Sequence, residues 1–153
     1  MDFAVINTPI GALYIAREDG FITEIKYAGR YAAETAPRTE LLKQAVSQIE
    51  QYFLGRLKEF DLPLNPKVTP YRRKVLEALA RVEYGKTVTY KELAERTGNP
   101  KAVRAVGSAM RTNPIILAIP CHRVLKSDGG LGNYSAGGSG NKDWLLAIEK
   151  QNR

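Results

Sequence analysis

The chain has 153 residues, of which 44% are hydrophobic and 25% charged, with a formal net charge of +7. This length suits one domain or two small lobes, and the composition excludes a disordered tail. No apolar run is long enough to span a bilayer, and residues 1–3 do not open an export signal.

The first 66 residues predict a small sheet with a covering helix. Apolar residues alternate between residues 3 and 25, with turn signals at residues 8–11 and 18–20, which favours a three-stranded antiparallel meander. Thr39 can cap a helix in which apolar residues recur at helical spacing until Gly55. Pro63 and Pro66 then indicate an extended linker and a lobe boundary near residue 66.

The second lobe, residues 67–153, reads as mainly helical. Thr69 caps a helix that Pro70 begins and that continues toward Gly85, and residues 89–92 have the Thr-x-x-Glu spacing of a capping box. Asn99 and Pro100 follow Gly98 and are expected to start another helix over residues 101–112, which completes a helix-turn-helix candidate. The predicted fold class is therefore α+β, an antiparallel sheet-plus-helix lobe followed by a helical domain.

Positive charge is concentrated in this second lobe. Residues 1–66 carry a net charge of −2, whereas residues 67–153 carry +9. On the helix expected over residues 101–112, one face combines cations with small residues and no acid, namely Lys101, Arg104, Ala105, Ser108, Ala109 and Arg111. The alternative is an ordinary solvated face, but a basic helix after a turn favours binding of a polyanion such as duplex DNA.

Cys121 is the only cysteine and precedes His122, the only histidine. The apolar run at residues 115–119 lies between prolines and predicts a short buried extended segment that leads to Cys121. A lone cysteine is usually inert, but His122 and Arg123 could favour a thiolate. In an extended backbone Cys121 and His122 would point to opposite sides, so their coupling needs a water molecule or a bent backbone.

The content of cysteine, histidine and glycine argues against a metal site or a nucleotide cofactor. Structural zinc needs four thiolates or imidazoles, and this chain has one of each. The glycines of residues 129–138 match no nucleotide-binding fingerprint and favour a loop around a site. A chain with one free cysteine is expected in a reducing compartment, the cytoplasm, or the nucleus where there is one.

The sequence from about residue 69 to residue 150 resembles the O6-alkylguanine-DNA alkyltransferases, also called methylated-DNA–protein-cysteine methyltransferases. The motif that carries the resemblance is Ile119-Pro120-Cys121-His122-Arg123-Val124, accompanied by Tyr84-Gly85, Thr89-Tyr90, Arg104-Ala105-Val106-Gly107, Asn113-Pro114 and Gly132-Asn133-Tyr134-Ser135. Residues 136–141 are longer by one residue and richer in glycine than the common family pattern, which leaves the width of the pocket open.

The resemblance implies a suicide methyltransferase for DNA repair. Cys121 would take the alkyl group from O6 of a guanine that is flipped out of double-stranded DNA. His122 and Glu149 would activate the Cys121 thiol through a water molecule, and Asn113 would brace the turn beneath it. Tyr90 would help to turn out the nucleotide and protonate the base, and Arg104 would fill the vacated space from the minor groove. The implied pocket wall is Met110, Val124, Tyr134 and Ser135.

The expected partner is double-stranded DNA that carries O6-alkylguanine. The residues expected to contact the DNA are Tyr90, Lys101, Arg104, Ala105, Ser108, Ala109, Arg111 and Arg123. The protein is expected to act as a monomer, without a cofactor and without a membrane. Two alternatives stay open. One is a lesion-binding protein without chemistry, although Cys121 speaks against it. The other is a cysteine hydrolase, which needs a histidine that can approach the nucleophile.

Overall fold

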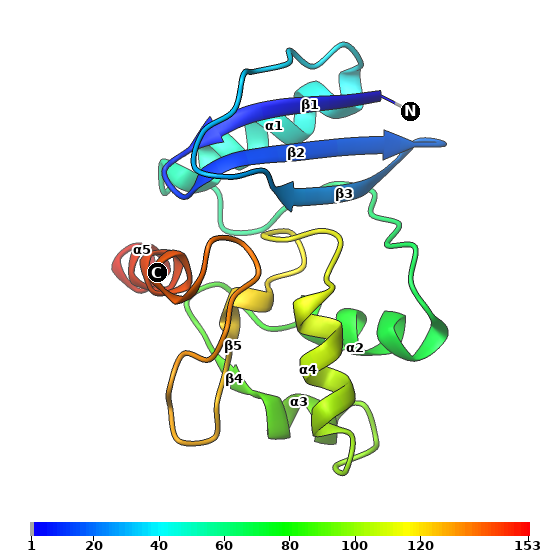
Figure 1. Ribbon diagram of the computed structural model, residues 1–153, viewed down its shortest axis with the longest axis vertical. Helices are drawn as coiled ribbons and strands as arrows, with labels where there is room; N and C mark the ends of the chain where they lie inside the picture. Colours follow the sequence, from blue (N-terminus) through cyan, green and yellow to red (C-terminus); the bar gives the residue numbers. More distant parts are fainter. Residues whose placement is uncertain (1) are drawn as a thin grey trace. The chain divides into compact units, whose positions relative to one another are not determined.

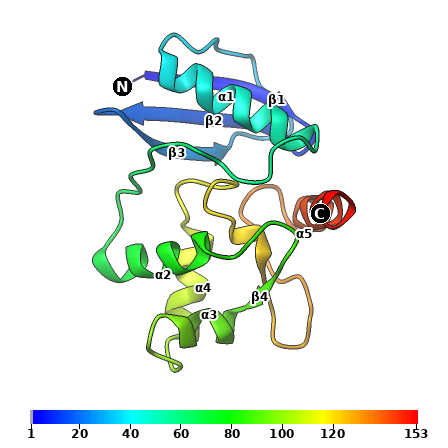
Figure 2. The same ribbon diagram turned by 180° about the vertical axis from the view of Figure 1, so that it is seen from behind.

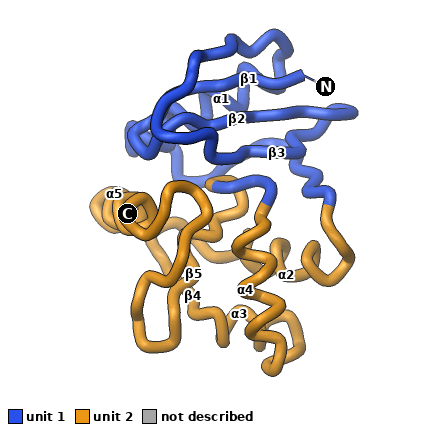
Figure 3. Tube along the Cα trace, in the orientation of Figure 1, with its two compact units in different colours: residues 1–67, 114–116 blue, residues 68–113, 117–153 orange. Residues whose placement is uncertain are grey.

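The computed structural model describes residues 2–153 and divides the chain into two compact units (Figure 3). The first unit comprises residues 1–67 and 114–116, and the second comprises residues 68–113 and 117–153. The lobe boundary expected near residue 66 lies close to the first boundary between the units. Residues 114–116, however, were expected in the second lobe and belong to the first unit. These residues join the first unit because Ile115 bridges to Ile25, a pairing between distant residues that no local pattern signals.

The first unit contains the predicted three-stranded antiparallel meander. Its strands are β1 (Asp2–Thr8), β2 (Gly11–Glu18) and β3 (Phe21–Tyr27), in the spatial order β1-β2-β3. The first hairpin closes with Thr8 opposite Gly11, and the second turns through Asp19 and Gly20, both at positive φ. Backbone hydrogen bonds from the segments at residues 63–65 and 114–116 cover the outer edge of β3, so this edge is not left open.

Helix α1 (Glu40–Phe53) covers one face of this sheet (Figures 1 and 2). The Thr39 side chain accepts the hydrogen bond of the Leu42 amide, which is the cap that the sequence predicted. The core lies between the helix and the sheet and is formed by Leu13, Ile15, Ile22, Ile25, Leu42, Ala45, Ile49 and Tyr52, all 0% exposed. On β1 the buried residues are Ala4 and Ile6, while Phe3 points outward and stacks on Tyr14.

Three packed helices form the base of the second unit: α2 (Pro70–Ala80), α3 (Tyr90–Arg96) and α4 (Val103–Arg111). Thr69 caps α2, and Thr89 and Glu92 form the reciprocal hydrogen bonds of the predicted capping box on α3. The α+β class and the helical second lobe are thus confirmed. No helix within residues 2–153 is sufficiently long and apolar to cross a bilayer.

The start of α4 differs from the sequence prediction. Asn99 and Pro100 do not cap and begin it, since the helix starts at Val103 after Ala102, which makes no side-chain cap. The Asn99 side chain instead accepts the Lys101 amide within the connecting turn. Asn before Pro favours a turn as strongly as a helix start, and here the turn prevails.

The remaining elements of the second unit bring distant segments together. Strand β4 (Val88–Thr89) pairs in parallel with β5 (Val124–Leu125), so the stretch after Cys121 is tied to the start of α3. The 3-10 helix η1 (Cys121–Arg123) packs against the C-terminal helix α5 (Ser139–Asn152). These two contacts position the residues around Cys121.

Candidate active site

Cys121 begins helix η1 and is 3% exposed. The predicted extended segment before it is wrong, because residues 116–118 form a turn in which Leu117 has a φ of +70°. A buried apolar run between prolines does not distinguish a strand from a buried turn. The amide of Cys121 donates to the carbonyl of Ile119 at 2.8 Å, which fixes the cysteine at the end of this turn.

The 3-10 conformation changes the relation between Cys121 and His122. With three residues per turn, neighbouring side chains lie about 120° apart around the axis, not on opposite sides as in a strand. The bent backbone that the sequence analysis required for their coupling is therefore present at residues 121–123.

Asn113 supports the cysteine from the end of the preceding helix. Its buried side-chain amide donates to the carbonyl of Ile119 at 2.8 Å. Burial raises the pKa of the Cys121 thiol, while a hydrogen bond from Asn113 and the charge of Lys142 lower it in part. The net shift is upward, so Cys121 is a thiol at neutral pH and needs a proton acceptor to become a nucleophile.

His122 and Glu149 form a buried pair beside the cysteine. The Nε2 atom of His122 lies 2.6 Å from Oε2 of Glu149, and both side chains are at most 1% exposed. Burial lowers the pKa of His122, and the charges of Arg123 and Lys142 lower it further against the opposing effect of Glu149. The imidazole is therefore neutral at neutral pH, with Nε2–H donating to the carboxylate.

Arg123 completes this network and points inward, not toward the surface where its predicted contact with DNA would place it. The guanidinium is buried, and it donates to both carboxylate oxygens of Glu149 at 2.8 and 3.0 Å. Burial alone would raise the pKa of Glu149, but the hydrogen bonds and charges of His122 and Arg123 hold it well below the usual range. Both sequence neighbours, His122 and Val124, are fully buried, but a cation at such a position gives no local sign of whether its own side chain points inward.

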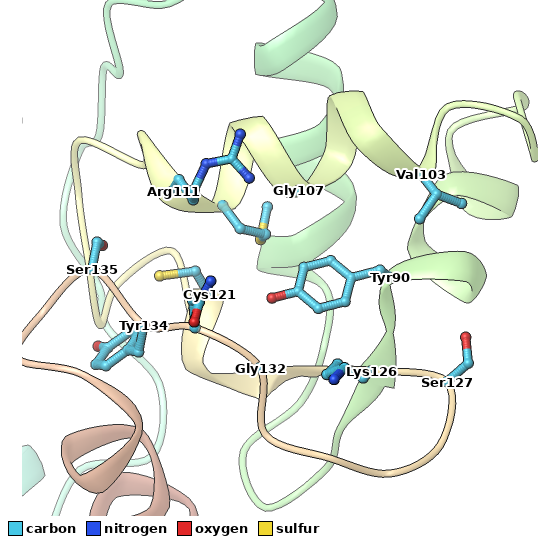
Figure 4. A pocket seen from close by; sticks show the side chains of 12 residues that line it. Tyr90, Val103, Gly107, Arg111, Cys121, Lys126, Ser127, Gly132, Tyr134 and Ser135 are labelled. Carbon is cyan, nitrogen blue, oxygen red and sulfur yellow. The ribbon is translucent and has the colours of Figure 1, made fainter.

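A cavity of about 430 Å³ opens onto Cys121 (Figure 4). It is lined by Tyr90, Val103, Gly107, Met110, Arg111, Cys121, Lys126, Ser127, Gly132, Asn133, Tyr134 and Ser135. These residues come from α3, α4, η1 and the loop between β5 and α5. A cavity of this size can hold a purine base with a substituent.

Three of the four residues expected in the pocket wall line this cavity, namely Met110, Tyr134 and Ser135. Val124 does not, because it is fully buried in the short ladder opposite Val88. The wall also includes Lys126, Ser127 and Asn133, which were not expected there. Asn133 lies within the Gly132-Asn133-Tyr134-Ser135 motif, and the other two residues lie a few positions before it.

Tyr90 lies across the cavity from Cys121, with its hydroxyl directed toward the cysteine in Figure 4. Burial raises its pKa, and a negative charge on Cys121 would raise it further. Tyr90 therefore keeps its proton at neutral pH and can donate a hydrogen bond into the cavity.

Lys142 is a buried cation that the sequence analysis missed. Its Nζ donates to the carbonyl of Asn133 at 3.5 Å and lies 5.8 Å from the centre of the Tyr90 ring. Burial lowers its pKa, while Cys121 raises it. The spacing of Lys142, Leu145 and Glu149 on one helical face was the signal that could have revealed it.

The exposed side of α4 carries part of the predicted DNA-binding set. Arg104, Ala105 and Arg111 are exposed, and Ser108 is half-buried where it accepts a hydrogen bond from Arg72 of α2 at 2.9 Å. Lys101 is exposed but precedes the helix. The Arg72 contact extends the basic face beyond the residues that the sequence singled out.

Ala109 is not on that side, where its predicted contact with DNA would place it. It is 1% exposed and packs inward with Val106 and Met110. Val103, the first residue of α4, is 39% exposed and lines the cavity. Ala109 faces inward because the packing of α4 against α2 and α3 determines which face of the helix is buried.

Comparisons with known proteins agree with this arrangement of fold and site. The family model described as 6-O-methylguanine DNA methyltransferase, DNA binding domain, matches residues 70–151, and the ribonuclease-like domain of the same name matches residues 1–66. The chain belongs to the methylated-DNA–protein-cysteine methyltransferase family. The resemblance seen from about residue 69 to residue 150 is thereby confirmed, and the second match extends the family to residues 1–66.

Individual relatives match over nearly their whole length. The Methanosarcina barkeri methylated-DNA–protein-cysteine methyltransferase is 38% identical, with 99% of each chain covered. The crystal structure of the Mycobacterium tuberculosis O6-methylguanine methyltransferase has a TM-score of 0.88 at 35% identity, covering 99% of this chain and 93% of the other. The M. tuberculosis OGT solved in complex with DNA has a TM-score of 0.85 at 37% identity, covering 97% and 92%.

Proposed function

We propose that this protein repairs O6-alkylguanine in double-stranded DNA by moving the alkyl group to the sulfur of its own Cys121. The observation that carries the proposal is the position of Cys121 on a base-sized cavity, next to a buried His122–Glu149 pair. Membership of the methyltransferase family and similarity to a relative solved with DNA support the same reaction and partner.

The damaged base must leave the helical stack to reach this cavity. Its alkyl carbon is inaccessible in a duplex, and α4 carries both the exposed Arg104 and the cavity-lining residues Val103 and Arg111. In this proposal α4 enters the minor groove, where the small Ala105 permits close approach and Arg104 occupies the space of the flipped nucleotide. Tyr90 and Ser135 would then contact the base, Ser135 through its backbone N–H to O6.

The chemical step moves one alkyl group and two protons. The Cys121 thiol gives its proton, carried by a bridging water, to Nδ1 of His122, because Nε2 is engaged by Glu149. The thiolate attacks the alkyl carbon, so an S–C bond forms while the C–O6 bond breaks and its electron pair stays with the base. The Tyr90 hydroxyl supplies the proton that restores neutral guanine, and the proton taken up by His122 returns to Tyr90 through water, so both side chains end neutral.

The product explains why each molecule would act once. A thioether does not hydrolyse, and no second thiol exists in the chain to remove the alkyl group. The protein would therefore be consumed stoichiometrically, one molecule for each lesion. No bound cofactor is required, because the nucleophile and both proton carriers belong to the chain.

The test is the intact mass of the protein after mixing with a duplex that contains one O6-methylguanine, followed by peptide mapping. The expected result is the gain of one methyl group in place of a hydrogen, confined to Cys121 and saturating at one per molecule. A matched duplex with unmodified guanine should leave the mass unchanged. Tight binding of the lesion duplex without any mass change would contradict transfer and leave a protein that only recognises damage.

A further inference from the structure

Arg123 is buried, so DNA binding does not explain its position, and its hydrogen bonds go to Glu149 and Val82 and not to Cys121. Each arm of its guanidinium is engaged: Nε and Nη2 donate to the two oxygens of Glu149, and Nη1 donates to the carbonyl of Val82 at 2.7 Å. The side chain is 7% exposed. Such a fork-to-carboxylate pair is rigid and strongly directional.

The pair matters because the same carboxylate holds the imidazole. Oε2 of Glu149 lies 2.6 Å from Nε2 of His122 and 3.0 Å from Nη2 of Arg123, while Oε1 also accepts the amide of Gly85 at 3.2 Å. A buried carboxylate next to an imidazole with no other cation favours the imidazolium form. An imidazolium has no lone pair and could not accept the proton of Cys121.

The other charged and titratable groups near the pair do not replace Arg123. Lys142 on α5 and Arg123 both disfavour a charged His122, and Glu149 favours it. Tyr84 lies with its ring 5.7 Å from the guanidinium carbon and is affected by the charge of Glu149, and Tyr134 is affected by both Glu149 and Cys121. Among these groups Arg123 is the cation that contacts Glu149 directly.

We propose that Arg123 is a positioning residue that neutralises Glu149, so that His122 stays a neutral imidazole with its Nε2–H fixed on the carboxylate and its Nδ1 able to take a proton. The role in alkyl transfer rests on the proposed function, but the protonation state of His122 does not. Arg123 thus acts on Cys121 only through the carboxylate and the imidazole.

The chain allows a direct measurement because His122 is its only histidine. The NMR signal of the imidazole Cε1–H, followed against pH without DNA, reports this one group. We expect a wild-type midpoint below the ordinary value of about 6.5. In Arg123→Met we expect the midpoint to rise by at least about one pH unit, because Glu149 then has no cation to offset it.

Arg123→Lys keeps a charge but loses the fork, so it should raise the midpoint less than Arg123→Met. Because Arg123→Lys retains a cation beside Glu149, it can be used for the titration if Arg123→Met does not fold. Arg81→Gln is the matched control, since it removes one arginine from an exposed position at the end of α2 and should leave the midpoint unchanged. A wild-type midpoint at or above 6.5, or a folded Arg123 variant with an unchanged or lower midpoint, would overturn the proposal.

The rate of methyl transfer provides a separate readout. A base that works as neutral imidazole loses activity as pH falls through its pKa, so a raised pKa moves this loss to higher pH. We divide each protein's transfer rate by its own plateau rate at high pH. If the midpoint rises by one unit, this ratio should be about tenfold lower for the variant than for wild type at pH values below both midpoints. If wild type transfers no methyl group at any pH, the proposed function fails, while the titration still decides the role of Arg123.

Discussion

The surroundings of Cys121 and the exposed side of α4 both depend on arginine, but they use it in opposite ways. Arg123 is buried and bound to Glu149 on two atoms, whereas Arg104 and Arg111 are exposed and have room to meet a partner. Removing one member of a buried ion pair leaves the other charge uncompensated, while removing an exposed charge mainly changes binding. Mutations in the first region should therefore affect chemistry and stability, and those in the second should affect DNA binding.

Replacement of Cys121 tests this separation with the largest expected effect. Cys121→Ala should abolish methyl transfer, because no other thiol exists, and leave the affinity for lesion DNA within about threefold of wild type. Intact mass measures the first quantity and fluorescence anisotropy with a labelled lesion duplex measures the second. A loss of DNA binding as large as the loss of transfer would mean that the two regions are not separable.

Replacement of Glu149 should damage the interior in two ways. Glu149→Gln leaves Arg123 buried without an anion, which should cost about 3–5 kcal/mol in the free energy of unfolding. It also removes the carboxylate that orients His122, so transfer should slow by about 100-fold. Urea denaturation and single-turnover kinetics measure these changes.

Glu83→Gln is the matched control for Glu149. Glu83 faces Lys86 at 3.9 Å, and both side chains are well over half exposed. Such a surface pair contributes about 0–1 kcal/mol, so stability should barely change and the transfer rate should be that of wild type. Equal destabilisation by the two substitutions would contradict a special role for the buried pair.

The sequence predicted best those features that depend on neighbours along the chain. The caps at Thr39, Thr69 and Thr89 and the two hairpins were predicted correctly, because each is a hydrogen-bonding or turn pattern within a few residues. The α+β class followed from them. Cys121 and its motif were also visible locally.

Features that depend on distant contacts could not be predicted. The burial of Val124 against β4 and the inward direction of Arg123 are both set by segments far along the chain. The burial of Ala109 depends on how α4 packs on α2 and α3. The short motif thus singled out Cys121 and His122 as candidates, while the packing determined which neighbours surround them.

On the exposed side of α4, Arg104 should have an effect that differs in kind from a phosphate contact. If it fills the space of the flipped base, Arg104→Ala should slow methyl transfer by about 10–100-fold while lowering duplex affinity much less. Arg104→Lys, which keeps the charge, should restore affinity more completely than rate. Equal losses of rate and affinity would argue for a simple charge contact instead.

Arg72 should show the smallest effect and a purely electrostatic one. Its guanidinium donates to Ser108 at 2.9 Å, which holds a cation beside the exposed face of α4 without placing it on the cavity. If it meets a DNA phosphate, Arg72→Gln should weaken binding about threefold for lesion and unmodified duplexes alike and reduce the slope of log K against log salt by about one. Methyl transfer at saturating protein should keep its wild-type rate. A salt dependence identical to that of wild type would remove Arg72 from the DNA-binding surface and leave its bond to Ser108 as a contact that only joins α2 to α4.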